Sequence, residues 1–300
     1  MSNKNNPYNY RAYFGMKLWQ KLALTTVVLA WMSILIAYIN PVLDFDMSKI
    51  LSSSSTLFSI LVGFFIASAM ANFLRLKTLI STEIGALYSI YKFSTLMSKS
   101  LGKEVKDAID KYVTSSFDWE LENYVENTQK EFEKISDIFA SRNANPKGNK
   151  EQQILNSLMN NISILPATRN EISIVAKTTL NTLYWSLLII LAGLTVFAVL
   201  MGTQFTFVSI TLAVSISAAV VFALFLLDEI DRNKLNEYDI SFNNFNLLLV
   251  NLGKLPYYLE TDIKSGRVKP DLTKPYRLCK YKDFPNSLEK SITIVNPKGK

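Results

Sequence analysis

Twenty-five uncharged residues, ILSSSSTLFSILVGFFIASAMANFL at positions 50–74, decide how this chain folds. The run passes through Arg75 and Lys77 into an amphipathic pattern that continues to about Ser100. Because ~20 apolar residues are enough to cross the hydrocarbon core of a bilayer, the pattern predicts one helix that spans a membrane and continues into water.

Small residues recur at every fourth position of this run, at Ser59, Gly63, Ala67 and Ala71. Residues four apart share one helix face, where small side chains let another backbone approach closely or leave room for water. The spacing alone leaves two interpretations open, a face for helix packing and a face that lines a pore.

The charge pattern predicts three further spans. Residues 22–43 carry no charge, and neither do the fifty residues between Lys177 and Asp228. One helix of that length would be ~75 Å long against a hydrocarbon core of ~30 Å, so the run must fold back, most simply at 201–206. We therefore predict spans at about 20–40, 56–75, 179–201 and 206–228.

The distribution of charge predicts the orientation. Lys4, Arg11, Lys17 and Lys21 precede the first span without any acidic residue. The positive-inside rule then places both termini and the long middle segment in the cytoplasm of a multi-pass protein of the cell (inner) membrane.

The chain has no histidine and a single cysteine, Cys279. Histidine-based triads and metal sites are excluded, and no enzyme activity is expected.

The segment between the second and third spans has helical periodicity almost throughout, with fourteen basic and thirteen acidic residues. This balance predicts a solvated helical bundle and no nucleic-acid partner. Acidic side chains such as Glu83 and Glu104 are expected at its surface. One helix is predicted to stop before Pro166, and Thr168 is predicted to cap another that runs straight into the third span.

Three carboxylates, Asp228, Glu229 and Asp231, fall within one turn after the fourth span. Carboxylates at this spacing can gather a hard cation such as calcium, although a solvated acidic helix end is the favoured interpretation. No other cofactor is expected.

The two ends of the chain are polar. Residues 1–17 contain four aromatic residues and predict either an arm along the membrane interface or a disordered terminus. Residues 264–300 have ten basic and three acidic residues and four prolines, which predicts an extended basic tail for anionic lipid headgroups or a neighbouring subunit.

Five regions follow from these patterns: an interfacial arm (1–17), the first two membrane helices (18–78), a cytoplasmic helical domain (79–177), a membrane hairpin (178–228) and a cytoplasmic carboxy-terminal region with the basic tail (229–300).

This order of parts resembles the bestrophin family and its prokaryotic bestrophin-like relatives. The resemblance lies in SILVGFFIASAMANFLRLKTLISTE at 59–83 and LDEID at 227–231. It implies a helical oligomer with a central pore lined by the second span, which conducts anions in the best-known members. The pore-lining residues would be Ser59, Gly63, Phe64, Ala67 and Ala71. Asp228, Glu229 and Asp231 would lie near the place where animal members bind calcium.

We therefore expect an all-α protein with four transmembrane helices and a long helical cytoplasmic insertion between helices 2 and 3, assembled around a central axis. The expected function is an ion channel that prefers anions such as chloride, in a homo-oligomer (tetramer or pentamer) in the lipid bilayer. The alternative is a non-conducting membrane scaffold or sensor whose cytoplasmic bundle binds a partner.

Overall fold

The computed structural model describes residues 18–39, 47–140, 148–232, 243–264, 268–271, 273–283, 287 and 289–296. The chain divides into two compact units. The apolar unit comprises Phe14–Leu74 and Thr178–Leu235. The polar unit comprises Met1–Tyr13, Arg75–Lys177 and Asn236–Lys300. The predicted arm, residues 1–17, lies outside the described residues.

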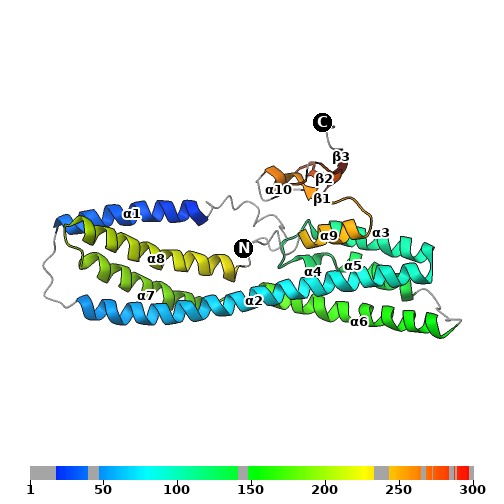
Figure 1. Ribbon diagram of the computed structural model, residues 1–300, viewed down its shortest axis with the longest axis horizontal. Coiled ribbons are helices and arrows are strands. Elements are labelled where there is room, and N and C mark those ends of the chain that lie inside the picture. Colours follow the sequence, from blue (N-terminus) through cyan, green and yellow to red (C-terminus); the bar gives the residue numbers. More distant parts are fainter. Residues whose placement is uncertain are drawn as a thin grey trace. The chain divides into compact units, whose positions relative to one another are not determined.

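The apolar unit is built from α1 (Leu18–Ile39), the first part of α2 (Met47–Met97), α7 (Thr182–Met201) and α8 (Phe207–Asp231). Helix α8 packs against both α1 and α7, as Figure 1 shows. The turn predicted at 201–206 is confirmed, because α7 ends at Met201 and the Thr206 side chain accepts a hydrogen bond from the Ser209 N–H to begin α8. Within the described residues, four helical segments have the length and hydropathy of membrane spans.

The long second helix is continuous. Helix α2 runs without interruption from Met47 to Met97, through Arg75, so the prediction of one helix extending past its apolar part is confirmed. Its first part belongs to the apolar unit and the remainder to the polar unit.

Two helix boundaries differ from the prediction. Helix α6 (Asn149–Lys177) passes through Pro166, where a stop was predicted. Leu158, Leu165 and Ile172 form one buried stripe on both sides of the proline, and this packing outweighs the hydrogen bond that proline cannot make. The helix also does not continue into α7, because residues 178–181 are not helical and Asn181 caps a new helix.

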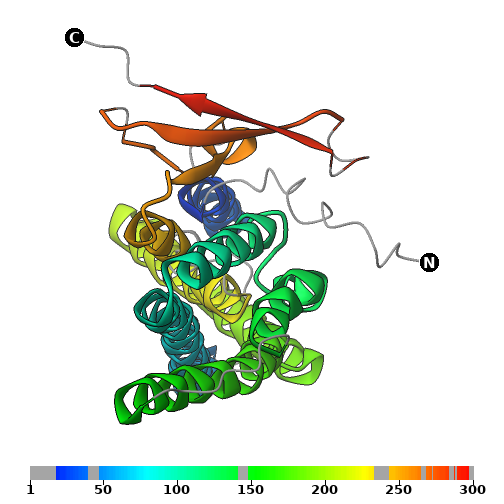
Figure 2. The ribbon, with the colours of Figure 1, turned by 90° about the vertical axis from the view of Figure 1, so that its right-hand side faces the viewer.

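The polar unit contains the rest of α2, α3 (Lys99–Ser116), α4 (Tyr124–Asn127), α5 (Gln129–Ala140), α6, α9 (Asn243–Asn251) and α10 (Glu260–Lys264). Helix α3 packs against α5, and α4 against α6. Figure 2 shows a small sheet on the side of this unit where α3 and α9 lie.

The carboxy-terminal region is folded in part, where an extended tail was predicted. Strands β1 (Tyr257–Leu259), β2 (Tyr276–Tyr281) and β3 (Lys290–Val295) form a sheet in the order β1-β2-β3. Strand β1 pairs with β2 in parallel, and β2 pairs with β3 in antiparallel register. Apart from these strands and the connecting segments, the described residues are helical, as predicted.

Candidate functional site

The outward face of α2 carries every residue that was expected to line a pore. Ser59, Gly63, Phe64, Ala67 and Ala71 are all exposed. The opposite face of the same helix is buried, and its residues are Phe58, Val62, Phe65, Ala69 and Phe73. One chain therefore uses only one side of α2 for its own core and leaves the side with small residues uncovered.

Two contacts hold the inner face of α2 against α7. The rings of Phe65 and Tyr184 lie 5.2 Å apart between centroids. The Thr195 hydroxyl lies 3.2 Å from the Ser54 hydroxyl and donates a hydrogen bond to it. These contacts fix which face of α2 points outward.

The outward face of α2 differs in size from the outward faces of α1 and α7. Large apolar side chains are exposed on those helices, among them Val27, Trp31, Ile189 and Ile190. Leu57, Ile60 and Phe64 are exposed on α2 as well, so the difference lies in the stripe of small residues at 59, 63, 67 and 71. On α2 a Cβ atom added to Gly63 would meet no atom within 4 Å. Large apolar side chains suit contact with lipid, whereas a face of small residues suits contact with another helix or with water.

The acidic turn, Asp228, Glu229 and Asp231, does not converge on one point. Asp228 Oδ1 lies 2.6 Å from Arg232 Nε. Glu229 Oε1 lies 3.4 Å from Lys21 Nζ. Both oxygens of Asp231 accept the Leu180 N–H, at 2.8 and 3.1 Å. The three carboxylates thus have partners just after α8, on α1 and just before α7.

This geometry does not fit the calcium ion that the family resemblance implied. Calcium takes 6–8 oxygen ligands at 2.3–2.6 Å, so several carboxylates must point at one centre. Within the part of the chain that the structure describes, no three Asp, Glu, His or Cys side chains are close enough to hold a metal ion. The residues that were expected as metal ligands instead bind groups of the protein itself.

Comparison with known proteins decides the family. The profile of the Bestrophin-like domain matches residues 47–233, which run from the start of α2 to just past the acidic turn. The chain belongs to the bestrophin-like family. A crystal structure of a bacterial bestrophin homologue from Klebsiella pneumoniae, with one tryptophan replaced by alanine, has a similar fold with a TM-score of 0.58. The sequences are 14% identical, and the match covers 80% of this chain and 100% of that one. No curated protein matches the chain.

The bestrophin-like protein also contains a buried ionic cluster that the sequence did not predict. Glu83 of α2 is 0% exposed, so its expected place at the surface is wrong. Its carboxylate accepts hydrogen bonds from the hydroxyls of Tyr112 and Tyr124, the latter at 2.7 Å. Arg169 of α6 is 2% exposed, and its Nη1 lies 3.6 Å from Glu83 Oε1.

Arg169 completes the cluster with contacts to three elements. Its guanidinium donates to the Tyr112 hydroxyl and, at 2.7 Å, to the Val125 carbonyl. It also lies 4.2 Å from the ring centroid of Phe132. Burial raises the pKa of Tyr112 and of Tyr124 well above its ordinary value, and the charge of Glu83 adds to the shift. Both tyrosines therefore stay protonated and act as donors.

A signal for this cluster was present in the sequence. Glu83 lies between Ile80 and Leu87 on the buried stripe of α2, and Arg169 lies between Leu165 and Ile172 on the buried stripe of α6. A charge within an apolar stripe needs a buried partner of opposite charge. Periodicity alone does not say which two stripes meet.

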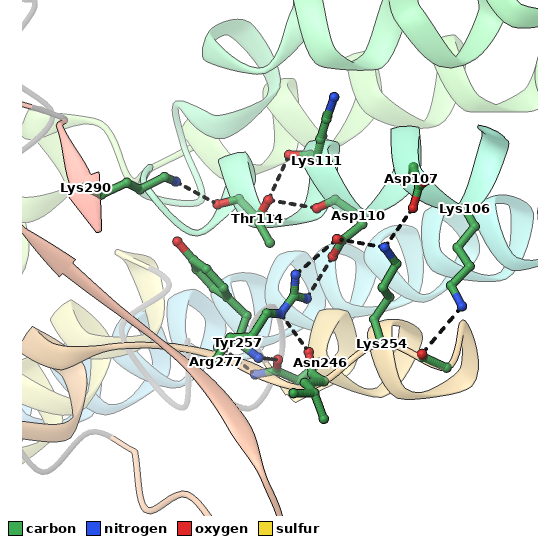
Figure 3. Close-up of polar contacts among 12 residues, drawn as sticks. Lys106, Asp107, Asp110, Lys111, Thr114, Asn246, Lys254, Tyr257, Arg277 and Lys290 are labelled. Atoms are coloured by element: carbon green, nitrogen blue, oxygen red, sulfur yellow. Dashed lines mark hydrogen bonds and ion pairs between the residues drawn. The ribbon is translucent and has the colours of Figure 1, made fainter. Parts of the chain in front are cut away.

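The carboxy-terminal sheet of the bestrophin-like protein is attached to α3 by charge, as Figure 3 shows. Arg277 of β2 forms a bidentate ion pair with Asp110, with Nη1–Oδ2 and Nη2–Oδ1 distances of 3.0 and 2.7 Å. Lys254 lies 2.7 Å from Asp107 and 3.4 Å from Asp110. Lys290 of β3 lies 2.6 Å from Asp118. Arg277 and Lys290 belong to the basic tail that was expected to contact lipid or a neighbouring subunit. In the structure they instead pair with Asp110 of α3 and with Asp118 in the turn after α3.

These pairs also shift the ionisation of their members. The hydrogen bond from Lys254 holds the pKa of Asp107 below its usual range. Partial burial by itself would lower the pKa of Lys254, but the hydrogen bonds and negative charges of Asp107 and Asp110 outweigh burial and raise it. Both groups are therefore charged at neutral pH, and the attachment of the sheet is ionic.

Proposed function

We propose that this bestrophin-like protein is an oligomeric ion channel that passes anions such as chloride through a pore lined by α2. The observation that supports the proposal is the outward face of α2, with Ser59, Gly63, Phe64, Ala67 and Ala71 exposed in one chain. When such helices surround a central axis, their small residues leave a path for water and ions. The ring of Phe64 side chains is then the narrowest apolar part of that path.

The proposed assembly is a homo-oligomer (tetramer or pentamer) in the cell membrane, with both termini and residues 79–177 in the cytoplasm. No pathway through a single chain is proposed. Spans α7 and α8 contain no charged residue between Thr182 and Leu227, so they offer no carboxylate or ion pair at membrane depth to couple a transported substrate.

The preference for anions follows from the charge of the chain. The formal net charge is +7, and residues 264–300, with ten basic and three acidic residues, account for all of it. Positive charge at the cytoplasmic mouth of a pore raises the local concentration of anions.

Planar-bilayer recording of the purified oligomer under a chloride gradient tests the proposal, with Gly63→Leu as the variant and Gly193→Leu as its control. Both glycines are exposed, and an added Cβ meets nothing within 4 Å at either site, so the two positions are matched in the space that one chain leaves for a side chain. Only Gly63 lies on the proposed pore face.

The proposal predicts currents that reverse near the chloride potential, that Gly63→Leu abolishes or reduces, and that Gly193→Leu leaves unchanged. Equal effects of the two substitutions would contradict the assignment of the pore to α2. A silent bilayer with intact oligomer would favour the non-conducting scaffold instead.

A further inference from the structure

We propose that the acidic turn Asp228, Glu229 and Asp231 is an ion-pair junction that holds α1 and α7 to the end of α8 and works without a metal ion. The turn belongs to the apolar unit together with all of its partners. The proposal concerns how this unit is held together and does not depend on whether the oligomer conducts.

The first connection joins α1 to α8. Lys21 is the last charged residue before the first span, and its Nζ lies 3.4 Å from Glu229 Oε1. The same Nζ lies 5.9 Å from the ring centroid of Phe225, one helical turn earlier on α8. The two side chains of the pair are only 30% and 20% exposed, so water screens their attraction less than at an open surface.

This connection also fixes how α1 and α8 align along their length. Ser33 lies twelve residues after Lys21, and Ser217 lies twelve residues before Glu229. In two antiparallel helices these serines reach the same level, ~18 Å from the ion pair at ~1.5 Å per residue. Both serines are 0% exposed, and α1 packs against α8. A shift of α1 by one turn would place Leu29 or Ala37 opposite Ser217 and break the Lys21–Glu229 pair.

The second connection joins α8 to the beginning of α7. Asp231 accepts the Leu180 N–H with both of its oxygens, and Leu180 immediately precedes Asn181, the capping residue of α7. A carboxylate in this position also interacts favourably with the positive amino-terminal end of the helix dipole. Asp231 therefore stabilises the break between α6 and α7, which the helical pattern of the sequence did not predict.

The third carboxylate is paired at the carboxyl end of α8. Asp228 pairs with Arg232 at 2.6 Å, one turn along the helix. With Lys21, Arg232 and the Leu180 N–H in place, each carboxylate has a partner supplied by the protein. A metal ion would have to displace them and turn the three side chains toward one centre. Lys21 and Arg232 thus provide the positive charge that a cation would otherwise bring.

Thermal melting of the full-length oligomer in detergent tests the junction through exchange of charges. Glu229→Lys sets two cations beside each other and is expected to lower the melting temperature by roughly 2–4 °C. The double variant Lys21→Glu/Glu229→Lys restores opposite charges and is expected to recover most of the loss. If the exchange recovers nothing, or Glu229→Lys melts like the unmodified protein, the junction is wrong.

The same assay tests independence from metal. The unmodified protein is expected to melt at the same temperature in calcium chloride and in EDTA. A rise in melting temperature with calcium that disappears in Glu229→Gln would overturn the proposal and restore the metal site. Neither readout uses current, so the outcome is separate from that of the channel recording.

Discussion

Replacing Glu83 with glutamine should destabilise the polar unit far more than replacing Glu104 with glutamine. The two glutamates look alike in the sequence, but Glu83 is 0% exposed and Glu104 is exposed. The Glu83→Gln substitution would leave the guanidinium of Arg169 buried without an opposite charge. The new amide oxygen can still accept one tyrosine hydroxyl, so the loss comes mainly from the missing charge.

The size of the loss follows from the geometry. Arg169 Nη1 and Glu83 Oε1 are 3.6 Å apart. Two unit charges at that distance attract by about 5 kcal/mol at an effective dielectric constant of ~20. Removal of one partner of a buried pair costs ~3–5 kcal/mol. We therefore expect Glu83→Gln to lose about 3 kcal/mol, or roughly 6–12 °C in melting temperature for a unit of this size.

Trp119 provides the assay because it belongs to the polar unit, whereas the other three tryptophans belong to the apolar unit. Its fluorescence is followed during thermal unfolding of full-length protein in which the other three are phenylalanine. A double variant, Glu83→Gln/Arg169→Met, should lose less than the sum of the two single variants, because no buried charge remains.

Two results would refute this reasoning. Glu83→Gln could unfold at the same temperature as Glu104→Gln. Alternatively, the losses of Glu83→Gln and Arg169→Met could simply add in the double variant. Either result would show that the two side chains do not form a buried, coupled pair.

Three further predictions concern the polar unit. Gly102→Ala should lower the melting temperature of the polar unit, because the added Cβ would lie 2.8 Å from the Cα atom of Thr95 near the end of α2. Gly85→Ala is the control: its Cβ would meet nothing within 4 Å, so this substitution should be neutral or stabilising. The raised pKa values of Tyr112 and Tyr124 mean that stability is fully present below pH ~10, the ordinary tyrosine pKa, and is lost above it as the unfolded chain ionises. Ultraviolet absorbance should show that Tyr124→Phe has one fewer tyrosine that ionises only on unfolding than the unmodified protein. Asp110→Asn should weaken the attachment of the carboxy-terminal sheet, so limited proteolysis should release that region faster, and an unchanged cleavage rate would contradict the ionic attachment.

The helices could be predicted from the sequence because their signals are local. An uncharged run of twenty-five residues and a regular apolar stripe identify α2 without knowledge of its neighbours. The fold-back at 201–206 follows from length alone. These features, with the acidic turn after the last span, were enough to indicate the family.

The contacts between elements could not be predicted in the same way. Glu83 is buried because Tyr112, Tyr124 and Arg169 meet it, and the nearest of them is 29 residues away in the sequence. The break before α7 depends on Asp231, 51 residues after Leu180. Strand β3 had a local signal, the β-branched run at 292–295, but the surrounding prolines and basic residues favoured a tail.

The accessibility of single cysteines to a charged thiol reagent tests the proposed pore most directly. The native Cys279 is buried and is first replaced by serine. Ala67→Cys on the outward face of α2 is then compared with Gly193→Cys on the exposed face of α7. The proposal predicts that a negatively charged methanethiosulfonate reagent, added from water, reduces the chloride current of Ala67→Cys and leaves that of Gly193→Cys unchanged. An Ala67→Cys channel whose current persists after complete modification, or one that cannot be modified from water, would contradict a pore lined by α2.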